Sequence, residues 1–222
     1  YEEDATRAWQ PASLTKLMTA YVVFTALKEG RYALNTEIGI TPRAFAQPPT
    51  RFGLGIGKTV SIELALHGLI IKSANDLAVA LAEATSGSDA AFVDEMNATA
   101  ARLGMTRTHF INPNGLPALI QVAVTAPEAD APVDGSPQKT GKDKAGKADA
   151  PPPAPIFHSA PPSDQARTSA RDMGLLAQAL HRDFPAYFPM FSEAEVEIGR
   201  RRAATHNELL KGFEGADGMK TG

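Results

Sequence analysis

Residues 11–28 read Pro11-Ala-Ser-Leu-Thr-Lys-Leu-Met-Thr-Ala-Tyr-Val-Val-Phe-Thr-Ala-Leu-Lys28, and this is the most informative stretch of the chain. Its apolar residues recur at the three- and four-residue spacing of a helix, and Val23 and Phe24 extend them around the remaining face. A helix that is apolar nearly all round is buried. The stretch therefore predicts a central helix on which the other elements pack.

A serine and a lysine three residues apart, Ser13 and Lys16, stand at the start of this helix. On a helix this spacing places both side chains on one face. A serine hydroxyl becomes a good nucleophile when a neighbouring base takes its proton, and a lysine is such a base when burial and nearby cations lower its pKa. The pair predicts nucleophilic catalysis, and it needs further cations and donors from elsewhere in the chain.

Two later motifs supply such groups in chain order. Ser73-Ala-Asn75 follows an apolar run, and Lys220-Thr221-Gly222 closes the sequence. Together with Ser13 and Lys16 they form the trio of motifs that penicillin-binding proteins and class A β-lactamases share. Taken singly, each motif is weak evidence, because a helix cap or a solvated lysine explains it equally well.

This chain itself shows that such short motifs also occur by chance. A second serine–lysine motif, Ser136-Pro-Gln-Lys139, overlaps a second Lys139-Thr140-Gly141. Pro137 separates that serine from that lysine, and the surrounding segment has almost no large apolar residue. We interpret this copy as a chance match.

The contexts of the first trio are far more specific than the motifs themselves. A similarity to one family covers most of residues 7–117 and 164–222. The matching segments are Pro11-Ala-Ser-Leu-Thr-Lys16-Leu-Met-Thr19, Gly68-Leu-Ile-Ile-Lys-Ser73-Ala-Asn-Asp76, Phe110-Ile-Asn-Pro-Asn-Gly-Leu116, Ser169-Ala-Arg-Asp172 and Gly218-Met-Lys-Thr-Gly222, together with residues 78–83, 92–105 and 206–210. The chain resembles the serine D-alanyl-D-alanine carboxypeptidases among the low-molecular-mass penicillin-binding proteins, of the penicillin-binding protein 5/6 type. One departure is Ala74, where the family usually has glycine, and it removes no reacting group.

The resemblance implies a mixed α/β fold of the β-lactamase/transpeptidase type, with an antiparallel sheet flanked by a helical cluster. It implies that residues 1–117 and 163–222 are parts of one catalytic domain, with Lys220-Thr221-Gly222 on a strand at the sheet edge. The family has strands before the serine helix and after this last motif, so we expect the sequence to be truncated at both ends.

Local signals predict the other elements. Capping residues and apolar periodicity predict helices at 61–72, 76–84 and 88–104 and from 168 or 169 onward, and alternation predicts a strand at 195–198. Residues 118–162 differ in composition, with nine of the 17 prolines, four lysines and five acidic residues. We expect this range to be a disordered or loosely packed insertion, in a loop position where added length costs little.

Composition excludes several classes of function. The chain has 222 residues, 43% of them hydrophobic, and a formal net charge of −3, which does not point to nucleic acid. It has no cysteine, so neither a disulfide nor a thiolate metal site is possible. No grouping of histidine and acidic residues has metal-site spacing, and we expect neither a metal nor a cofactor. No signal peptide or membrane-length apolar run is visible.

The resemblance assigns a role to each motif residue. Ser13 is the nucleophile that forms the acyl-ester, Lys16 is the general base, and Ser73 relays a proton to the departing D-alanine. Asn75 holds the substrate amide, and Lys220, Thr221 and Gly222 bind the terminal carboxylate. Burial and the positive charge of Lys220 are expected to keep Lys16 neutral.

The implied partners are peptidoglycan stem peptides ending in D-Ala-D-Ala and β-lactam antibiotics. The implied location is the periplasm or the outer face of the bacterial cytoplasmic membrane, reached by a signal peptide not present in this sequence, with a possible membrane anchor outside it.

Three alternatives remain open at this point. A D,D-endopeptidase would share the chemistry and differ in the shape of its pocket. A class A β-lactamase needs a further glutamate, and no Glu-x-x-x-Asn pattern lies between the second and third motifs. An inactive cell-wall-binding relative would not be expected to keep all three motifs. We expect His67 to be a structural histidine of the core or of a groove rather than a base, and His206 with Asn207 to form a structural turn.

Overall fold

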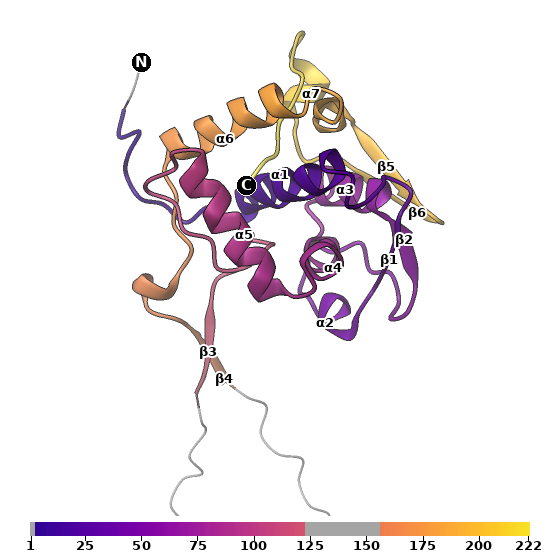
Figure 1. The fold of residues 1–222 in the computed structure, drawn as a ribbon, viewed down its shortest axis with the longest axis horizontal. Helices are drawn as coiled ribbons and strands as arrows, with labels where there is room; N and C mark the ends of the chain where they lie inside the picture. The colour runs from indigo at the N-terminus through magenta and orange to yellow at the C-terminus, as the bar shows by residue number, and fades with distance from the viewer. Residues whose placement is uncertain (1–2, 123–155) are drawn as a thin grey trace, which may run out of the picture.

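The computed structural model describes residues 3–122 and 156–222, and a buried helix lies at the centre of its fold. This helix, α1 (Thr15–Lys28), has 12 of its 14 residues buried, and it is preceded by one turn of 3-10 helix, η1 (Ala12–Leu14). It contacts four other helices and runs through the middle of the molecule in Figure 1. The predicted central helix is confirmed.

The helices around α1 begin where their capping residues predict. Helices α3, α5 and α6 are each preceded by a serine, Ser61, Ser88 or Ser169, whose hydroxyl accepts a backbone N–H in the first turn. The helical elements are α2 (Pro42–Phe45), α3 (Ile62–Ile71), α4 (Asn75–Ser86), α5 (Asp89–Arg102), η2 (Pro162–Asp164), α6 (Ala170–Asp183), η3 (Phe188–Ser192) and α7 (Leu209–Gly212).

The strands form three separate antiparallel pairs in the described part of the chain. They are β1 (Glu37–Gly39) with β2 (Thr59–Ser61), β3 (Leu119–Val122) with β4 (Ile156–Ser159), and β5 (Glu195–Ile198) with β6 (Arg201–Ala204). The predicted strand at 195–198 is confirmed as β5. Lys220-Thr221-Gly222 was expected on an edge strand, and the structure assigns these residues to none because they form no ladder with a neighbouring strand.

The range 118–162 is more regular at its ends than its composition predicts. Leu119 pairs with Ser159 and Val122 with Ile156, so β3 and β4 form a two-stranded ladder that projects from the body of the molecule in Figure 1. Residues 123–155, which include the second set of motifs at 136–141, lie outside the described residues.

Buried carboxylates fix the loops that surround α4 and α6. The Asp76 carboxylate accepts hydrogen bonds from the backbone N–H groups of Phe52 (2.9 Å) and Gly53 (2.7 Å). The Asp172 carboxylate accepts from the Arg107 N–H (2.8 Å) and the Thr108 hydroxyl (2.7 Å). Each carboxylate thus ties a distant loop to the first turn of its helix.

Helices α3 and α4 approach each other closely at Gly68. A Cβ atom at this position would lie 2.3 Å from Cδ1 of Leu77, which is fully buried. By contrast, a Cβ atom at Gly174 in α6 would meet no atom within 4 Å. The two glycines therefore form a matched pair for testing the packing.

We expect Gly68→Ala to lower the free energy of unfolding by about 1–3 kcal/mol, because the added methyl overpacks the contact between α3 and α4. Gly174→Ala should raise it by about 0.5–1 kcal/mol, because alanine loses less backbone entropy in a helix. Denaturant unfolding of both variants measures the difference. Equal stability of Gly68→Ala and the parent would contradict the packing described here.

The ladder of β3 and β4 predicts that residues 123–155 can be replaced. Val122 and Ile156 are paired, so a two-residue Asn-Gly turn has the right geometry to join them. We expect the melting temperature to be unchanged or slightly higher, because closing a shorter loop costs less entropy. A flexible Gly/Ser linker in the same place is the control. A clear loss of stability in both variants would mean that the replaced segment contributes to the fold.

Candidate active site

The three sequence motifs meet in one cavity of about 400 Å³. It is lined by Ala12, Ser13, Pro49, Thr50, Ser73, Asn75, Asn114, Gly115, Leu116, Pro117, His206, Lys220, Thr221 and Gly222. Six of the seven residues predicted from the motifs are in this lining. The seventh, Lys16, is buried and donates a hydrogen bond to Ser13.

Ser13 and Lys16 are hydrogen-bonded to each other at the start of the central helix. The Lys16 Nζ lies 3.3 Å from the Ser13 Oγ, as the three-residue spacing predicts. The same Nζ donates to the Asn114 carbonyl at 2.6 Å. Lys16 is only 1% exposed, and this burial, together with the positive charge of Lys220, lowers its pKa to about 7.

The backbone at Ser13 is shaped by a close contact with Gly115. Gly115 has φ +81°, and a Cβ atom there would lie 1.8 Å from the Ala12 carbonyl oxygen. Ala12 itself has φ +45°, in a region that alanine rarely adopts. The loop around Gly115 therefore determines how the residue before the nucleophile is placed.

This loop is held on α1 by hydrogen bonds that the sequence did not reveal. Thr19 donates to the Pro113 carbonyl at 2.6 Å, next to the bond from Lys16 to Asn114. Asn112 closes the turn by accepting from the Gly115 N–H (2.7 Å) and donating to the Leu116 carbonyl (2.7 Å). The Asn-Pro-Asn-Gly composition is typical of a turn, but it does not indicate that the turn contacts the lysine.

Ser73 and Asn75 lie where α3 gives way to α4. Ser73 has φ +59° and is 5% exposed, and its Oγ has no hydrogen-bond partner among the described residues. Asn75 is the first residue of α4, and its side-chain amide donates to the Pro48 carbonyl at 3.0 Å. Thr50 joins the two, since its hydroxyl donates to the Ser73 carbonyl (2.9 Å) and its carbonyl accepts from the Asn75 N–H (2.7 Å).

The last motif contributes the second cation of the cavity. Burial lowers the pKa of Lys220 to about 8, and its Nζ donates to the Thr221 carbonyl at 2.5 Å. A Cβ atom at Gly222 would lie 2.8 Å from Cγ of Leu14, so this residue packs beside the nucleophile. Asn207 supports the segment by donating to the Met219 carbonyl at 3.0 Å.

The two histidines differ in position. His206 is exposed and lines the cavity, whereas its neighbour Asn207 is buried and makes the structural contacts. His67 lies outside the cavity lining, with its Nδ1 3.4 Å from a Glu193 oxygen. Residues 3–122 and 156–222 contain no group of three side chains suited to hold a metal ion. Nor do these residues include a helix of the length and apolarity that a membrane crossing requires.

Comparison with known proteins connects this geometry to one family. The model of the family Peptidase_S11, described as D-alanyl-D-alanine carboxypeptidase, matches residues 1–222. The chain is 32% identical to the D-alanyl-D-alanine carboxypeptidase DacC of Escherichia coli over an alignment of length 228 that covers 100% of this chain and 46% of that protein. The chain thus spans about half the length of the curated relatives it matches.

Solved structures give the same result for the fold. Penicillin-binding protein 5 of Haemophilus influenzae superposes with a TM-score of 0.76 at 28% identity, covering 99% of this chain and 52% of that one. Penicillin-binding protein D2 of Listeria monocytogenes, in its cefotaxime-bound form, superposes with a TM-score of 0.70 at 25% identity, covering 100% and 72%. The predicted mixed α/β class and the predicted family are both confirmed. The chain belongs to the D-alanyl-D-alanine carboxypeptidase family.

Proposed function

We propose that this chain carries the reacting groups of a serine-type D-Ala-D-Ala carboxypeptidase, which removes the terminal D-alanine from peptidoglycan stem peptides. The observation that carries the proposal is a buried lysine with a pKa of about 7, 3.3 Å from a serine hydroxyl at the edge of a cavity. At neutral pH a large fraction of such an amine is unprotonated and able to accept the serine proton.

In the proposed first step, the Ser13 Oγ attacks the carbonyl carbon between the two D-alanines while Lys16 Nζ takes its proton. The carbon–nitrogen bond then breaks, and Ser73 passes a proton to the departing amine. The unpartnered and buried Ser73 Oγ supports this role, because a relay needs a hydroxyl that is free to exchange partners. Water then hydrolyses the ester on Ser13.

The other groups position the substrate. Lys220 supplies a cation for the terminal carboxylate, together with Thr221 and Gly222. Asn75 holds the substrate amide, and the Ser13 N–H stabilises the developing oxyanion. A β-lactam would acylate Ser13 through the same groups. The cefotaxime- and ampicillin-bound forms of a relative support β-lactams as ligands of this cavity.

The proposal extends to the organisation and location of the protein. We propose that residues 1–117 and 163–222 are parts of one catalytic domain that the range 118–162 interrupts, because both parts contribute residues to the cavity. Peptidoglycan lies outside the cytoplasmic membrane, so we place the protein in the periplasm or on the outer face of that membrane. A signal peptide or an anchor in flanking sequence would serve this location.

The assignment of the nucleophile is tested by covalent labelling. Labelled penicillin should attach at Ser13 and be lost in Ser13→Ala, because this is the serine hydrogen-bonded to the buried amine. Peptide mapping by mass spectrometry identifies the site. Ser136→Ala is the matched control and should label normally. Labelling that persists in Ser13→Ala would contradict the assignment.

The role of the base is tested by the pH dependence of acylation. Lys16 must be neutral, so the rate should rise as the pH passes about 7. Lys220 must be charged, so the rate should fall as the pH passes about 8. We therefore expect a narrow bell-shaped profile for the second-order rate constant of penicillin acylation, with its maximum between these values.

Substitution separates the two lysines in the same assay. Lys16→Arg keeps the charge but cannot release a proton, so acylation should fall by about 10²-fold or more. Lys220→Arg keeps a carboxylate-binding cation and should cost less. If Lys16→Arg acylated at a near-normal rate, Lys16 would supply only charge and the base would lie elsewhere.

A further inference from the structure

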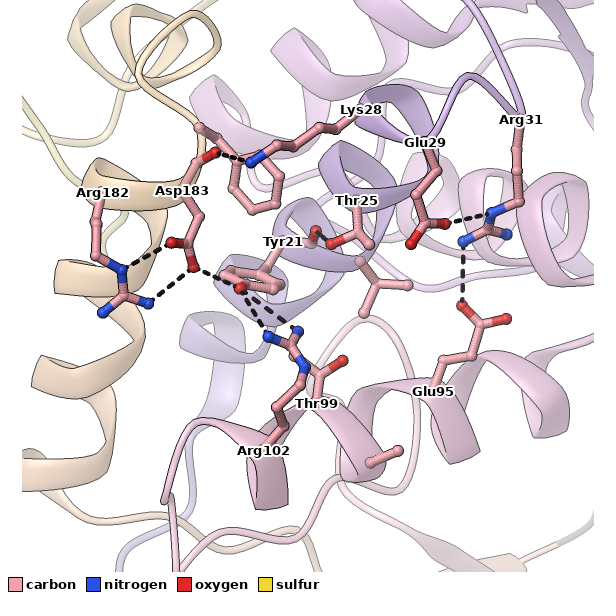
Figure 2. Close-up of a pocket in the computed structure, with 13 residues that line it drawn as sticks. Tyr21, Thr25, Lys28, Glu29, Arg31, Glu95, Thr99, Arg102, Arg182 and Asp183 are labelled. Carbon is pink, nitrogen blue, oxygen red and sulfur yellow. Dashed lines mark hydrogen bonds and ion pairs between the residues drawn. The ribbon is translucent and has the colours of Figure 1, made fainter.

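A second cavity, of about 790 Å³, lies between α1, α5 and the end of α6. None of the motif residues of the candidate active site is in its lining. Figure 2 shows that its charged side chains gather in two groups, one around Tyr21 and the other around Arg31. The volume is in the range of small-molecule sites.

The first group carries an excess of positive charge. The Asp183 carboxylate accepts two hydrogen bonds from the Arg182 guanidinium, at 2.7 and 2.9 Å, and one from the Tyr21 hydroxyl at 2.7 Å. Lys28 donates to the Asp183 backbone carbonyl (3.1 Å), and both terminal nitrogens of Arg102 donate to the Tyr21 hydroxyl oxygen at 3.5 Å. Within the described residues, neither Lys28 nor Arg102 has a carboxylate within 4.0 Å. Three cations thus face one carboxylate.

The second group carries an excess of negative charge. Arg31 lies between two carboxylates, with its Nε 2.9 Å from Glu29 and its terminal nitrogen 3.9 Å from Glu95. The single positive charge of this guanidinium therefore faces two negative charges. The cavity is positive at one end and negative at the other, and Thr25 and Thr99 line the wall between them.

The distance between the two groups follows from helix geometry. Glu95 and Arg102 are seven residues apart on α5, which corresponds to about 10 Å along the helix axis at 1.5 Å per residue. Lys28 and Glu29 are chain neighbours at the end of α1, but the Lys28 ammonium extends to the Asp183 carbonyl in the first group. An extended chain covers about 3.3–3.6 Å per residue. A peptide of about three residues therefore matches the separation.

We propose that this cavity binds a short peptide with free ends, about three residues long. Its carboxylate lies at Arg102 and Lys28, and its ammonium group lies at Glu29 and Glu95. The site is independent of the chemistry proposed at Ser13. Its charged side chains are partly exposed, so each ion pair contributes modestly and a dissociation constant on the order of 1 mM is expected at low salt.

Isothermal titration calorimetry with unblocked trialanine tests the proposal. Binding should be detectable, and it should weaken about two- to fivefold in Arg102→Gln, which removes one of the two cations that have no carboxylate partner. Glu95→Gln should weaken it too. The matched controls on or next to α5 are Arg107→Gln and Asp94→Asn, which lie outside the cavity lining and should bind as the parent does. Penicillin labelling of each variant verifies that it is folded.

Two measurements on the unsubstituted protein make the result decisive. Trialanine acetylated at its amino end, and trialanine amidated at its carboxyl end, should each bind more weakly than the free peptide. Protein already acylated by penicillin should bind trialanine as before. The proposal is overturned if acylation abolishes binding, if end-blocked peptides bind equally well, or if the free peptide does not bind.

Discussion

The structure around the candidate active site depends on one constraint, which is that the amine of Lys16 is buried and must still be hydrogen-bonded. Removing a charged ammonium from water is costly, and burial alone shifts the equilibrium toward the neutral amine. Neutral acceptors, the Asn114 carbonyl and the Ser13 hydroxyl, satisfy the amine. A carboxylate in their place would hold the proton on the lysine and remove its use as a base. The loop that carries Asn114 is fixed for this reason, and its contact with Ala12 places the nucleophile.

Helix α1 connects this constraint to the rest of the fold. Its first turn carries Lys16, and its buried face packs on α3, α4, α5 and α6. Residues further along the helix, such as Tyr21, line the second cavity. The same apolar helix therefore buries the Lys16 side chain and forms one wall of a second cavity.

The helices that the sequence predicted correctly were those whose ends depend on residues close together in the chain. Serine caps and apolar periodicity depend on neighbours within four residues, so α3, α5 and α6 began where predicted. The Asn114 carbonyl could not be predicted as the partner of Lys16, because it is a backbone group 98 residues away. Strands β3 and β4 are four residues each and adjoin a proline-rich range, so their alternation carried little signal. The second cavity depends on how three helices pack, which no local pattern specifies.

The proximity of Lys16 and Lys220 has a consequence for how the site responds to an anion. Lys220 contributes to the low pKa of Lys16 by its positive charge. A carboxylate that settles on Lys220 cancels much of that field, and the proton affinity of Lys16 then increases. An amine with greater proton affinity is a more effective acceptor in its neutral form. The binding of a carboxylate at Lys220 and the protonation of Lys16 are thus thermodynamically coupled.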